Sequence, residues 1–336
     1  MRFAINRLDM GSARGFAQSA TRAEELGWAM GLLPCNPLKV PDPYVSLALA
    51  ALQTETLQLG TLLDTPVIRH PSALAGSICT VAELAPGRIH LGLGIGDTAV
   101  RFNGLAPASS VAIAEAVKTT RALINGESVD VGALHPARLS APRPVPVWMA
   151  AQGPKNLRMA GRLADGVWIR VGRDAANLQM AWAAVCAGAE EAGRSVEELQ
   201  IGLIFHTAVC DEPADARLIG KAIAAGYYEY SEFLFDAPGI AWSGPDPHQL
   251  RPQVYPDFLH HRDPIAAGRL VDFLPDEVAD AFALYGSWAD IGQQLKDTLA
   301  HCPMPVDYVL PHPVLPLGSK VDYLSDCAQH LLRNFN

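Results

Sequence analysis

Hydrophobic and polar positions over the first 210 residues alternate between two patterns. Short runs that are apolar almost throughout are followed by longer segments whose apolar positions recur every three or four residues. The first pattern is typical of strands buried on both faces, and the second is typical of helices with one buried face. The predicted strands are 2–6, 28–33, 57–63, 88–94, 146–151, 166–170 and 200–209.

The segments between these strands carry helix start and stop signals. Ser12 is placed to cap one helix, which Gly27 ends, and Asp42 with Pro43 begins the next. Such residues satisfy the unpaired backbone groups at helix ends or lack an N–H to satisfy. The predicted helices are 12–26, 43–54, 71–84, 109–124, 154–163, 175–192 and 213–225.

The alternation predicts an α/β protein in which all strands are parallel. An eighth strand at 306–310 completes the set, and an amphipathic segment at 319–332 follows it. Eight such units form a (β/α)8 TIM barrel of about 250 residues. We therefore predict one domain over 1–336, with the surplus in a lid at 227–276. A doubly wound open sheet is the alternative, but residues 6–11 lack the glycine fingerprint expected after its first strand.

Composition excludes several classes of protein. Hydrophobic residues make up 49% of the 336 residues, which excludes disorder as the main state. The formal net charge of −9, without a cluster of basic residues, disfavours nucleic-acid binding. The longest apolar run, 44–52, is about half the roughly 20 residues that a membrane span needs.

The cysteines and the N-terminus indicate a cytoplasmic protein. The six cysteines form no C-x-x-C pair, and no apolar signal-peptide run follows the first residues. This spacing predicts free thiols in a reducing compartment and no metal site. His260 and His261, within the predicted lid, also lack metal-ligand spacing.

Glycines at the end of the fourth strand form one candidate site. In a barrel, functional side chains lie just beyond the C-terminal ends of the strands. The run Gly92-Leu-Gly94-Ile-Gly96-Asp97 does not match the G-x-G-x-x-G motif, because Asp97 stands where that motif has its third glycine. It indicates either close approach of a flat molecule or tight packing.

The end of the fifth strand forms a candidate anion site. Ala151, Gln152 and Gly153 lead into a helix that starts at Pro154, with Lys155 beside its first turn. A helix N-terminus offers unpaired N–H donors and partial positive charge, so a phosphate fits there. An ordinary helix start is the alternative reading.

Other candidates stand alone. Arg69, just before a helix start, opposes the helix dipole and so needs an anionic partner, either a ligand or a structural carboxylate. His206 lies near the end of the seventh strand.

Several of these segments together resemble one family. They are Pro43–Thr54, Leu59–Thr61, Arg69–Pro71, Gly87–Arg88, Leu91–Asp97, Pro146–Lys155 and Ala164–Val167. The chain resembles the bacterial luciferase-like monooxygenase superfamily, and within it most closely the coenzyme F420-dependent branch that contains methylenetetrahydromethanopterin reductase.

The resemblance implies a (β/α)8 barrel with the deazaflavin ring of coenzyme F420 at its mouth. A bulge after Thr61, often with a non-prolyl cis peptide, would support the ring at Leu62 and Leu63. Gly94, Gly96 and Asp97 would lie along the ring or its side chain. The turn from Ala151 to Lys155 would hold the phosphate.

One departure from the family matters for the chemistry. Dehydrogenases of this branch carry Asp-His after the second strand, where this chain has Leu33-Pro34-Cys35-Asn36. The resemblance then implies hydride transfer to an activated C=C, C=N, carbonyl or nitroaromatic substrate, with the proton supplied by Asp97, His206 or solvent. The alternatives are an FMN-dependent monooxygenase served by a partner flavin reductase, and a non-catalytic flavin-binding barrel. The resemblance also implies a homodimer formed through the second and third helices.

Overall fold

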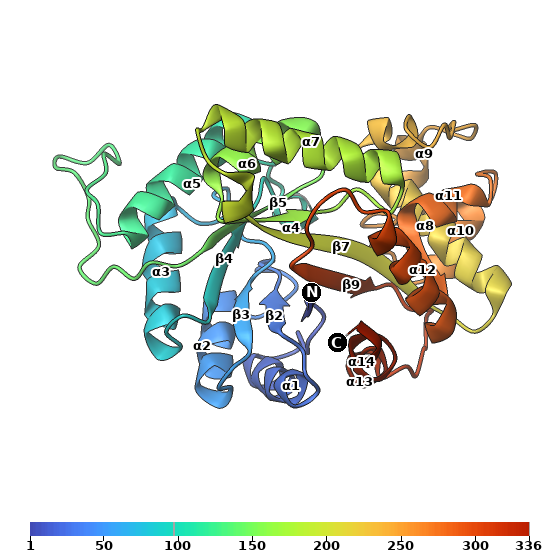
Figure 1. Cartoon of the computed structure of the whole chain (residues 1–336), viewed down its shortest axis with the longest axis horizontal. Helices are drawn as coiled ribbons and strands as arrows, with labels where there is room; N and C mark the ends of the chain where they lie inside the picture. Colours follow the sequence, from blue (N-terminus) through green and yellow to red (C-terminus); the bar gives the residue numbers. More distant parts are fainter. Residues whose placement is uncertain (97, 336) are drawn as a thin grey trace.

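Eight parallel strands close into a barrel in the computed structural model, which describes residues 1–96 and 98–335 (Figure 1). Each strand pairs with the next in sequence from β1 to β7, and β9 closes the barrel between β7 and β1. The strands are β1 (Arg2–Ile5), β2 (Met30–Leu33), β3 (Gln58–Thr61), β4 (Ile89–Leu93), β5 (Val147–Ala151), β6 (Gly166–Ile169), β7 (Gln200–Val209) and β9 (Tyr308–Pro313). The predicted TIM barrel is confirmed.

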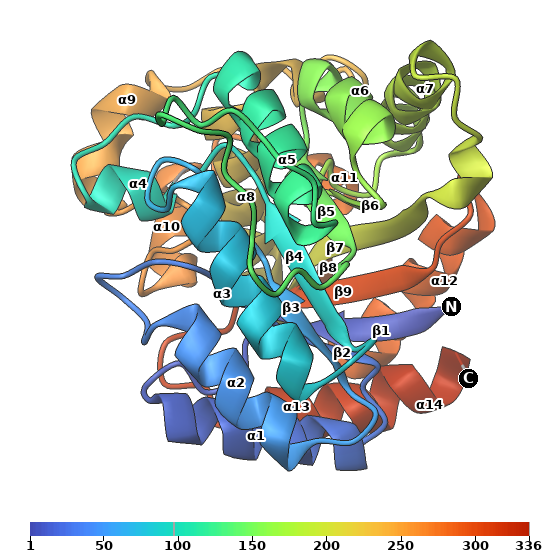
Figure 2. The same ribbon diagram turned by 90° about the vertical axis from the view of Figure 1, so that its left-hand side faces the viewer.

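Helices surround these strands, as the two perpendicular views show (Figures 1 and 2). Those of ten residues or more are α1 (Ala13–Glu25), α2 (Pro43–Gln53), α3 (Pro71–Leu84), α5 (Ser110–Ile124), α6 (Pro154–Leu163), α7 (Ala175–Glu191), α8 (Pro213–Tyr230) and α12 (Trp288–Ala300). The Ser12 hydroxyl accepts from the Gly15 amide, and the Asp42 carboxylate accepts from two amides of α2. The predicted caps therefore begin these helices. No helix among the described residues is long and apolar enough to cross a membrane.

A ninth strand, β8 (Ala283–Gly286), lies outside the predicted set. It pairs with the last four residues of β7, whereas β6 pairs with the first four. With ten residues, β7 is long enough to pair with β6 along its first part and with β8 along its last part. The end of β7 therefore extends past the barrel toward the segment that precedes β8.

Large aromatic side chains fill the interior of the barrel. Trp148, Trp168 and Tyr308 are almost completely buried there, and the two tryptophan rings lie 5.1 Å apart. Ile204 of β7 and Leu310 of β9 belong to the same cluster. Because alternate residues of a strand share a face, the next inward-facing positions lie at the C-terminal mouth. These positions are occupied by Arg170, His206 and His312.

The segment predicted as a lid, 227–276, begins within α8, which continues to Tyr230. Short helices follow: η2 (Glu232–Phe235), α9 (Pro247–Leu250), η3 (Arg251–Gln253) and α10 (Pro264–Leu270). The segment contacts the barrel through polar bonds, in which the Gln152 amide donates to the Ser231 hydroxyl and the Thr98 hydroxyl donates to Asp257 at 3.2 Å. These contacts put it beside the ends of β4 and β5, and its action as a lid stays a prediction. The remaining elements are α4 (Thr98–Phe102), η1 (Val196–Glu198), α11 (Glu277–Phe282), α13 (Tyr323–Cys327), η4 (Ala328–Leu332) and α14 (Arg333–Phe335).

Candidate functional site

The peptide bond between Leu62 and Leu63, directly after β3, is cis, as the family resemblance predicts. The chain there keeps hydrogen bonds to the strand on one side, since the Leu62 amide donates to the Leu33 carbonyl at 2.9 Å. On the other side the Asp64 amide donates to the Gly92 carbonyl at 2.9 Å. The bulge is therefore part of the sheet, and Leu62 belongs to the cluster that fills the barrel.

Glycines of β4 lie against this bulge. A Cβ at Gly94 would come within 2.6 Å of the Leu63 side chain, and one at Gly92 within 2.1 Å of the Thr61 carbonyl oxygen. The Thr61 hydroxyl donates to the Gly92 carbonyl and accepts from the Gly92 amide, both at 2.9 Å. The hydrogen-bonding capacity of the Thr61 side chain thus goes mainly to pairing β3 with β4. Gly96 has a positive φ of 74°, which glycine adopts without strain.

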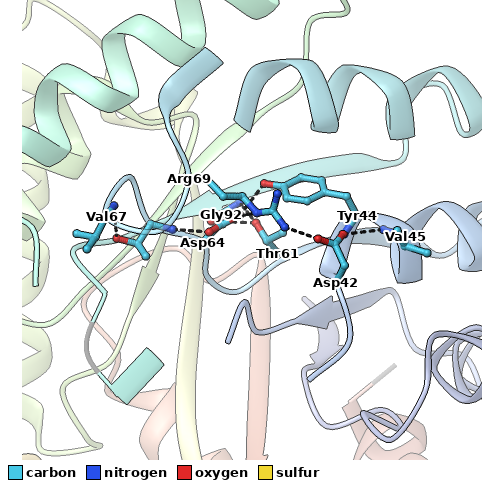
Figure 3. Close-up of polar contacts among 9 residues, drawn as sticks. Asp42, Tyr44, Val45, Thr61, Asp64, Val67, Arg69 and Gly92 are labelled. Atoms are coloured by element: carbon cyan, nitrogen blue, oxygen red, sulfur yellow. Dashed lines mark hydrogen bonds and ion pairs between the residues drawn. The ribbon is translucent and has the colours of Figure 1, made fainter. Parts of the chain in front are cut away.

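A buried ionic network anchors the loop after β3 (Figure 3). The Tyr44 hydroxyl donates to Asp64 at 2.9 Å, and Arg69 lies between Asp64 and Asp42 and pairs with both carboxylates. Burial raises the pKa of Asp64, and bonds from Thr65, Tyr44 and Arg69 oppose only part of that rise.

The partner expected for Arg69 is thus structural. Its guanidinium lies on two carboxylates of its own chain, so the alternative of an anionic ligand has no support here. Arg158 near the start of α6 is engaged in the same way by Glu191. Neither cation is available to neutralise a phosphate.

The turn into α6 is open. Gly153 is the N-cap, at φ −82° and ψ 146°, and no side chain there bonds to the first turn. A Cβ built on Gly153 would have no atom within 4 Å, so a side chain could be added there without a clash. Lys155 is exposed and has no recorded partner among the described residues. The geometry matches an anion site, because Pro154 has no N–H and the Asn156 amide bonds to Gly153, which leaves the Lys155 amide and its side-chain cation at the helix start.

Gln152 and Ala151 connect this turn to the barrel mouth. Ala151 ends β5 and Pro154 opens α6, as predicted. The Gln152 side-chain carbonyl accepts from Nε of Arg170 at 2.9 Å, while its amide group donates to Ser231. The orientation of Gln152 is therefore fixed from two sides.

His206 faces the mouth from β7 and is almost completely buried. The Gly172 amide donates to the Tyr227 oxygen, so the single hydroxyl proton of Tyr227 is free to donate to Nδ1 of His206 at 3.1 Å. When Tyr227 donates, the ring proton of a neutral His206 lies on Nε2. Burial, together with nearby Arg170, lowers the pKa of His206 well below its ordinary value, so the ring is neutral at pH 7.

Arg170, which the sequence places at the end of the sixth strand, also lies at the mouth, and two further side chains there, Arg7 and His312, were missed. Arg170 stacks near the rings of Tyr227 and Tyr230, at 5.4 and 6.0 Å. His312 is the direct register partner of His206, and their rings lie 4.9 Å apart.

Arg7 donates to Nε2 of His312 at 3.2 Å. Extending the strand alternation by one more step would have found His312, whereas Arg7 lies beyond the strand and carried no signal.

Two other predictions have different outcomes. Asp97 lies outside the described residues, so its proposed role stays a prediction. Cys35, at the position of the family Asp-His pair, is buried, and burial raises its pKa well above its ordinary value. No group of His, Cys, Asp and Glu among the described residues could hold a metal ion.

The chain was compared with known proteins. Residues 2–301 match the model of the luciferase-like monooxygenase family. A 5,10-methylenetetrahydromethanopterin reductase of Methanolobus tindarius is 29% identical over 192 residues, 55% of this chain and 58% of the relative. An F420-dependent hydroxymycolic acid dehydrogenase of Mycobacterium tuberculosis is 31% identical over 212 residues, 58% of this chain and 56% of the relative. The chain thus spans a little over half the length of these curated relatives.

A solved structure has the same fold. The coenzyme F420-dependent tetrahydromethanopterin reductase of Methanopyrus kandleri superimposes with a TM-score of 0.80 at 20% identity. The match covers 100% of this chain and 99% of that one. The likeness therefore includes the barrel, the order of its strands and the segment before β8.

Proposed function

Because the chain belongs to the luciferase-like monooxygenase family, we propose that it is an oxidoreductase that binds coenzyme F420 at the barrel mouth. In this proposal it transfers hydride between the coenzyme and a small organic substrate. The relatives that align with a little over half of the chain include a 5,10-methylenetetrahydromethanopterin reductase and an F420-dependent hydroxymycolic acid dehydrogenase.

The observation that carries the proposal is the presence of two features at the mouth. One is the bulge expected beneath the deazaflavin ring, and the other is a helix start suited to the coenzyme phosphate. The cis bulge at Leu62 and Leu63 stands directly after β3, where the family resemblance places the ring, and it packs tightly against Gly94 just after β4. One strand further, the open start of α6 offers donors for a phosphate. Lys155 would supply a positive charge beside the phosphate, whereas the charges of Arg69 and Arg158 are paired with carboxylates of the protein.

When bound, the coenzyme would supply a hydride, so the chain must position the substrate and handle a proton. His206 is a described residue at the mouth that can orient the substrate, since its neutral ring can hydrogen-bond to the atom next to the electrophilic carbon. A hydride that reaches that carbon must be matched by one proton on the neighbouring atom. Because a neutral imidazole is too weak an acid to give up its N–H, solvent would supply this proton while His206 holds the accepting atom. Asp97 is the alternative donor.

The proposed substrate class is an activated C=C, C=N, carbonyl or nitroaromatic compound. Cys35 and Asn36 replace the acid–base pair used for sugars and alcohols, and a buried thiol with a raised pKa is a poor base at neutral pH. Hydride delivery to an electrophile depends more on orientation than on a strong base.

A second candidate is an FMN-dependent monooxygenase that receives reduced flavin from a partner reductase. The family model that matches is named for monooxygenases, and the same bulge and turn could hold FMN.

We also propose a homodimer. Val45, Leu49 and Leu52 lie on one face of α2 and are all exposed, Leu52 by 67%. Residues spaced by four and three positions form a continuous stripe along a helix, and an apolar stripe of this kind is typical of a subunit interface.

The proposal is tested by turnover. Purified protein is mixed with reduced F420 and a panel of enones, imines and nitroaromatics without oxygen, and coenzyme oxidation is followed at its absorption band. Substrate-dependent oxidation supports the proposal. Product formation only with reduced FMN and oxygen would instead identify the monooxygenase. If neither reaction occurs, the result supports the non-catalytic flavin-binding barrel.

A further inference from the structure

Two guanidinium groups at the barrel mouth have no carboxylate partner. Within residues 1–96 and 98–335, no acidic oxygen lies within 4.0 Å of a nitrogen of Arg7 or Arg170. Arg69, Arg121 and Arg251, in contrast, all pair with one. A cation taken out of bulk water is stable only when an opposite charge or several acceptors compensate it, so an anionic ligand at Arg7 and Arg170 would be stabilised.

These cations belong to one continuous wall. The strands β6, β7, β9 and β1 are consecutive around the barrel, and they carry Arg170, His206, His312 and, just after β1, Arg7. Each histidine pKa is lowered first by burial and then by the charges of both arginines. All four side chains therefore lie within electrostatic reach of one another.

Arg7 is the member of this wall that is open to a ligand. Its residue surface is exposed, yet the surrounding protein lowers its pKa from the ordinary value, against the opposing effect of Asp257. A side chain that is accessible to solvent and also surrounded by protein atoms is typical of the lining of a recess. Its recorded bond is the one to His312, which leaves further N–H groups of the guanidinium free.

Asp257, a carboxylate whose charge acts on Arg7 and His206, is committed elsewhere. Asp257 accepts from Tyr230 at 2.9 Å and from Thr98 at 3.2 Å, and it pairs with His260 at 2.8 Å. It is almost completely buried in these contacts. The positive charge of Arg7 and Arg170 is thus not cancelled at short range.

From these contacts we infer that the wall of Arg7, Arg170, His206 and His312 is a binding site for an anionic oxygen group of the substrate, either a carboxylate or a phosphate. Arg7 provides the charge and the donor fork, and Nε2–H of His206 provides a neutral donor. Arg170 adds long-range charge, because part of its own fork is bonded to Gln152.

Arg7 lies apart from the proposed phosphate turn, although Arg170 of the same wall bonds to Gln152 of that turn. The turn follows β5, whereas Arg7 follows β1, four strands further along the order β5, β6, β7, β9, β1. The inference takes from the proposed function only that substrate enters at this mouth, and it predicts anion binding even in the absence of coenzyme.

The test measures binding of matched anionic and neutral probes. Benzoate and benzamide, hexanoate and hexanamide, and inorganic phosphate are titrated into the coenzyme-free protein, and affinities are measured by saturation-transfer NMR. The carboxylates should bind at least tenfold more tightly than their amides. Displacement of benzoate by equimolar phosphate assigns the group to a phosphate, and failure of that displacement assigns it to a carboxylate.

Variants separate this wall from general charge effects. Arg7→Gln should weaken anion binding at least tenfold, and Arg7→Lys should restore part of it. Arg333→Gln is the matched control, because it removes the same charge from α14, whose Phe335 packs on Phe3 near the start of β1. The control should bind like the parent protein.

Three results would overturn the inference. The first is anion affinity that differs less than twofold between the parent and Arg7→Gln, and the second is binding of the amides as tight as that of the carboxylates. The third is loss of F420 affinity in Arg7→Gln equal to the loss of benzoate affinity, which would assign the wall to the coenzyme. If F420 does not bind at all but the carboxylates do, the proposed function fails and the anion site stands.

Discussion

Replacing Gly153 with aspartate should stabilise the protein and weaken coenzyme binding at the same time. The backbone at Gly153 is already in the extended conformation that aspartate adopts at an N-cap, and a Cβ there meets no atom within 4 Å. The new carboxylate would therefore accept from the Lys155 amide in the first turn of α6. That amide is the donor assigned to the coenzyme phosphate.

The two effects have different sizes. An aspartate cap in place of glycine contributes about 0.5–1 kcal/mol from the new bond and the helix dipole. Unfolding entropy of about 2.1 cal/mol/K per residue over 336 residues converts this to a Tm increase of about 1 °C. Loss of one charge-assisted hydrogen bond to phosphate costs about 1.5–3 kcal/mol, which weakens F420 binding roughly 10- to 100-fold.

The assay combines thermal unfolding with fluorescence titration of F420. Gly153→Asn is the matched control for charge, since it caps the helix without repelling a phosphate. It should stabilise the fold less and weaken coenzyme binding less than Gly153→Asp. Gly153→Ala adds only a methyl group and should leave F420 affinity within about threefold of the parent value.

One result would refute the reasoning. If Gly153→Asp raises Tm but leaves F420 affinity unchanged, the start of α6 is capped as expected and yet does not hold the phosphate. The anion site would then have to lie elsewhere around the mouth.

Three further substitutions test packing, assembly and pH dependence. Gly188→Ala should destabilise the fold by about 1–3 kcal/mol in urea unfolding, because its Cβ would lie 1.8 Å from the Arg158 carbonyl oxygen, and unchanged stability would contradict the α6–α7 packing. Leu52→Glu should give a monomer by light scattering if α2 forms the dimer interface, whereas an unchanged dimer would exclude that face. Burial raises the pKa of Asp257, but bonds from His260 outweigh it and lower the pKa to about 2, so the carboxylate contributes about 2 kcal/mol above pH 4 that is lost as pH falls toward 2. The stability difference between the parent and Asp257→Asn should shrink by that amount over the same range, and a constant difference would refute the assignment.

Local signals made most of the barrel predictable. Prolines at the first helical position and Ser or Asp caps located α1, α2, α3 and α6 within about a residue. Beyond residue 210 those signals became sparse. The strand β8 has only four residues, and its pairing with β7 depends on contacts that no local pattern encodes. The capping box of Ser287 and Asp290 could have identified α12, which was missed.

The candidate site was predictable where backbone geometry defines it. Glycine and proline in the Gln152–Lys155 turn, and the family resemblance at Leu62, indicated features that the structure contains. Side-chain partners were not predictable, because they join distant segments. Arg69 could not be assigned to Asp42 and Asp64 from spacing, nor could Arg7 be assigned to His312, 305 positions away.

The central claim is that the barrel mouth holds a deazaflavin. The most direct measurement is an equilibrium titration of the coenzyme-free protein with F420 and, separately, with FMN, followed by fluorescence. The account predicts saturable one-to-one binding of F420 that is at least tenfold tighter than that of FMN. Tight binding of FMN with no measurable binding of F420 would contradict it.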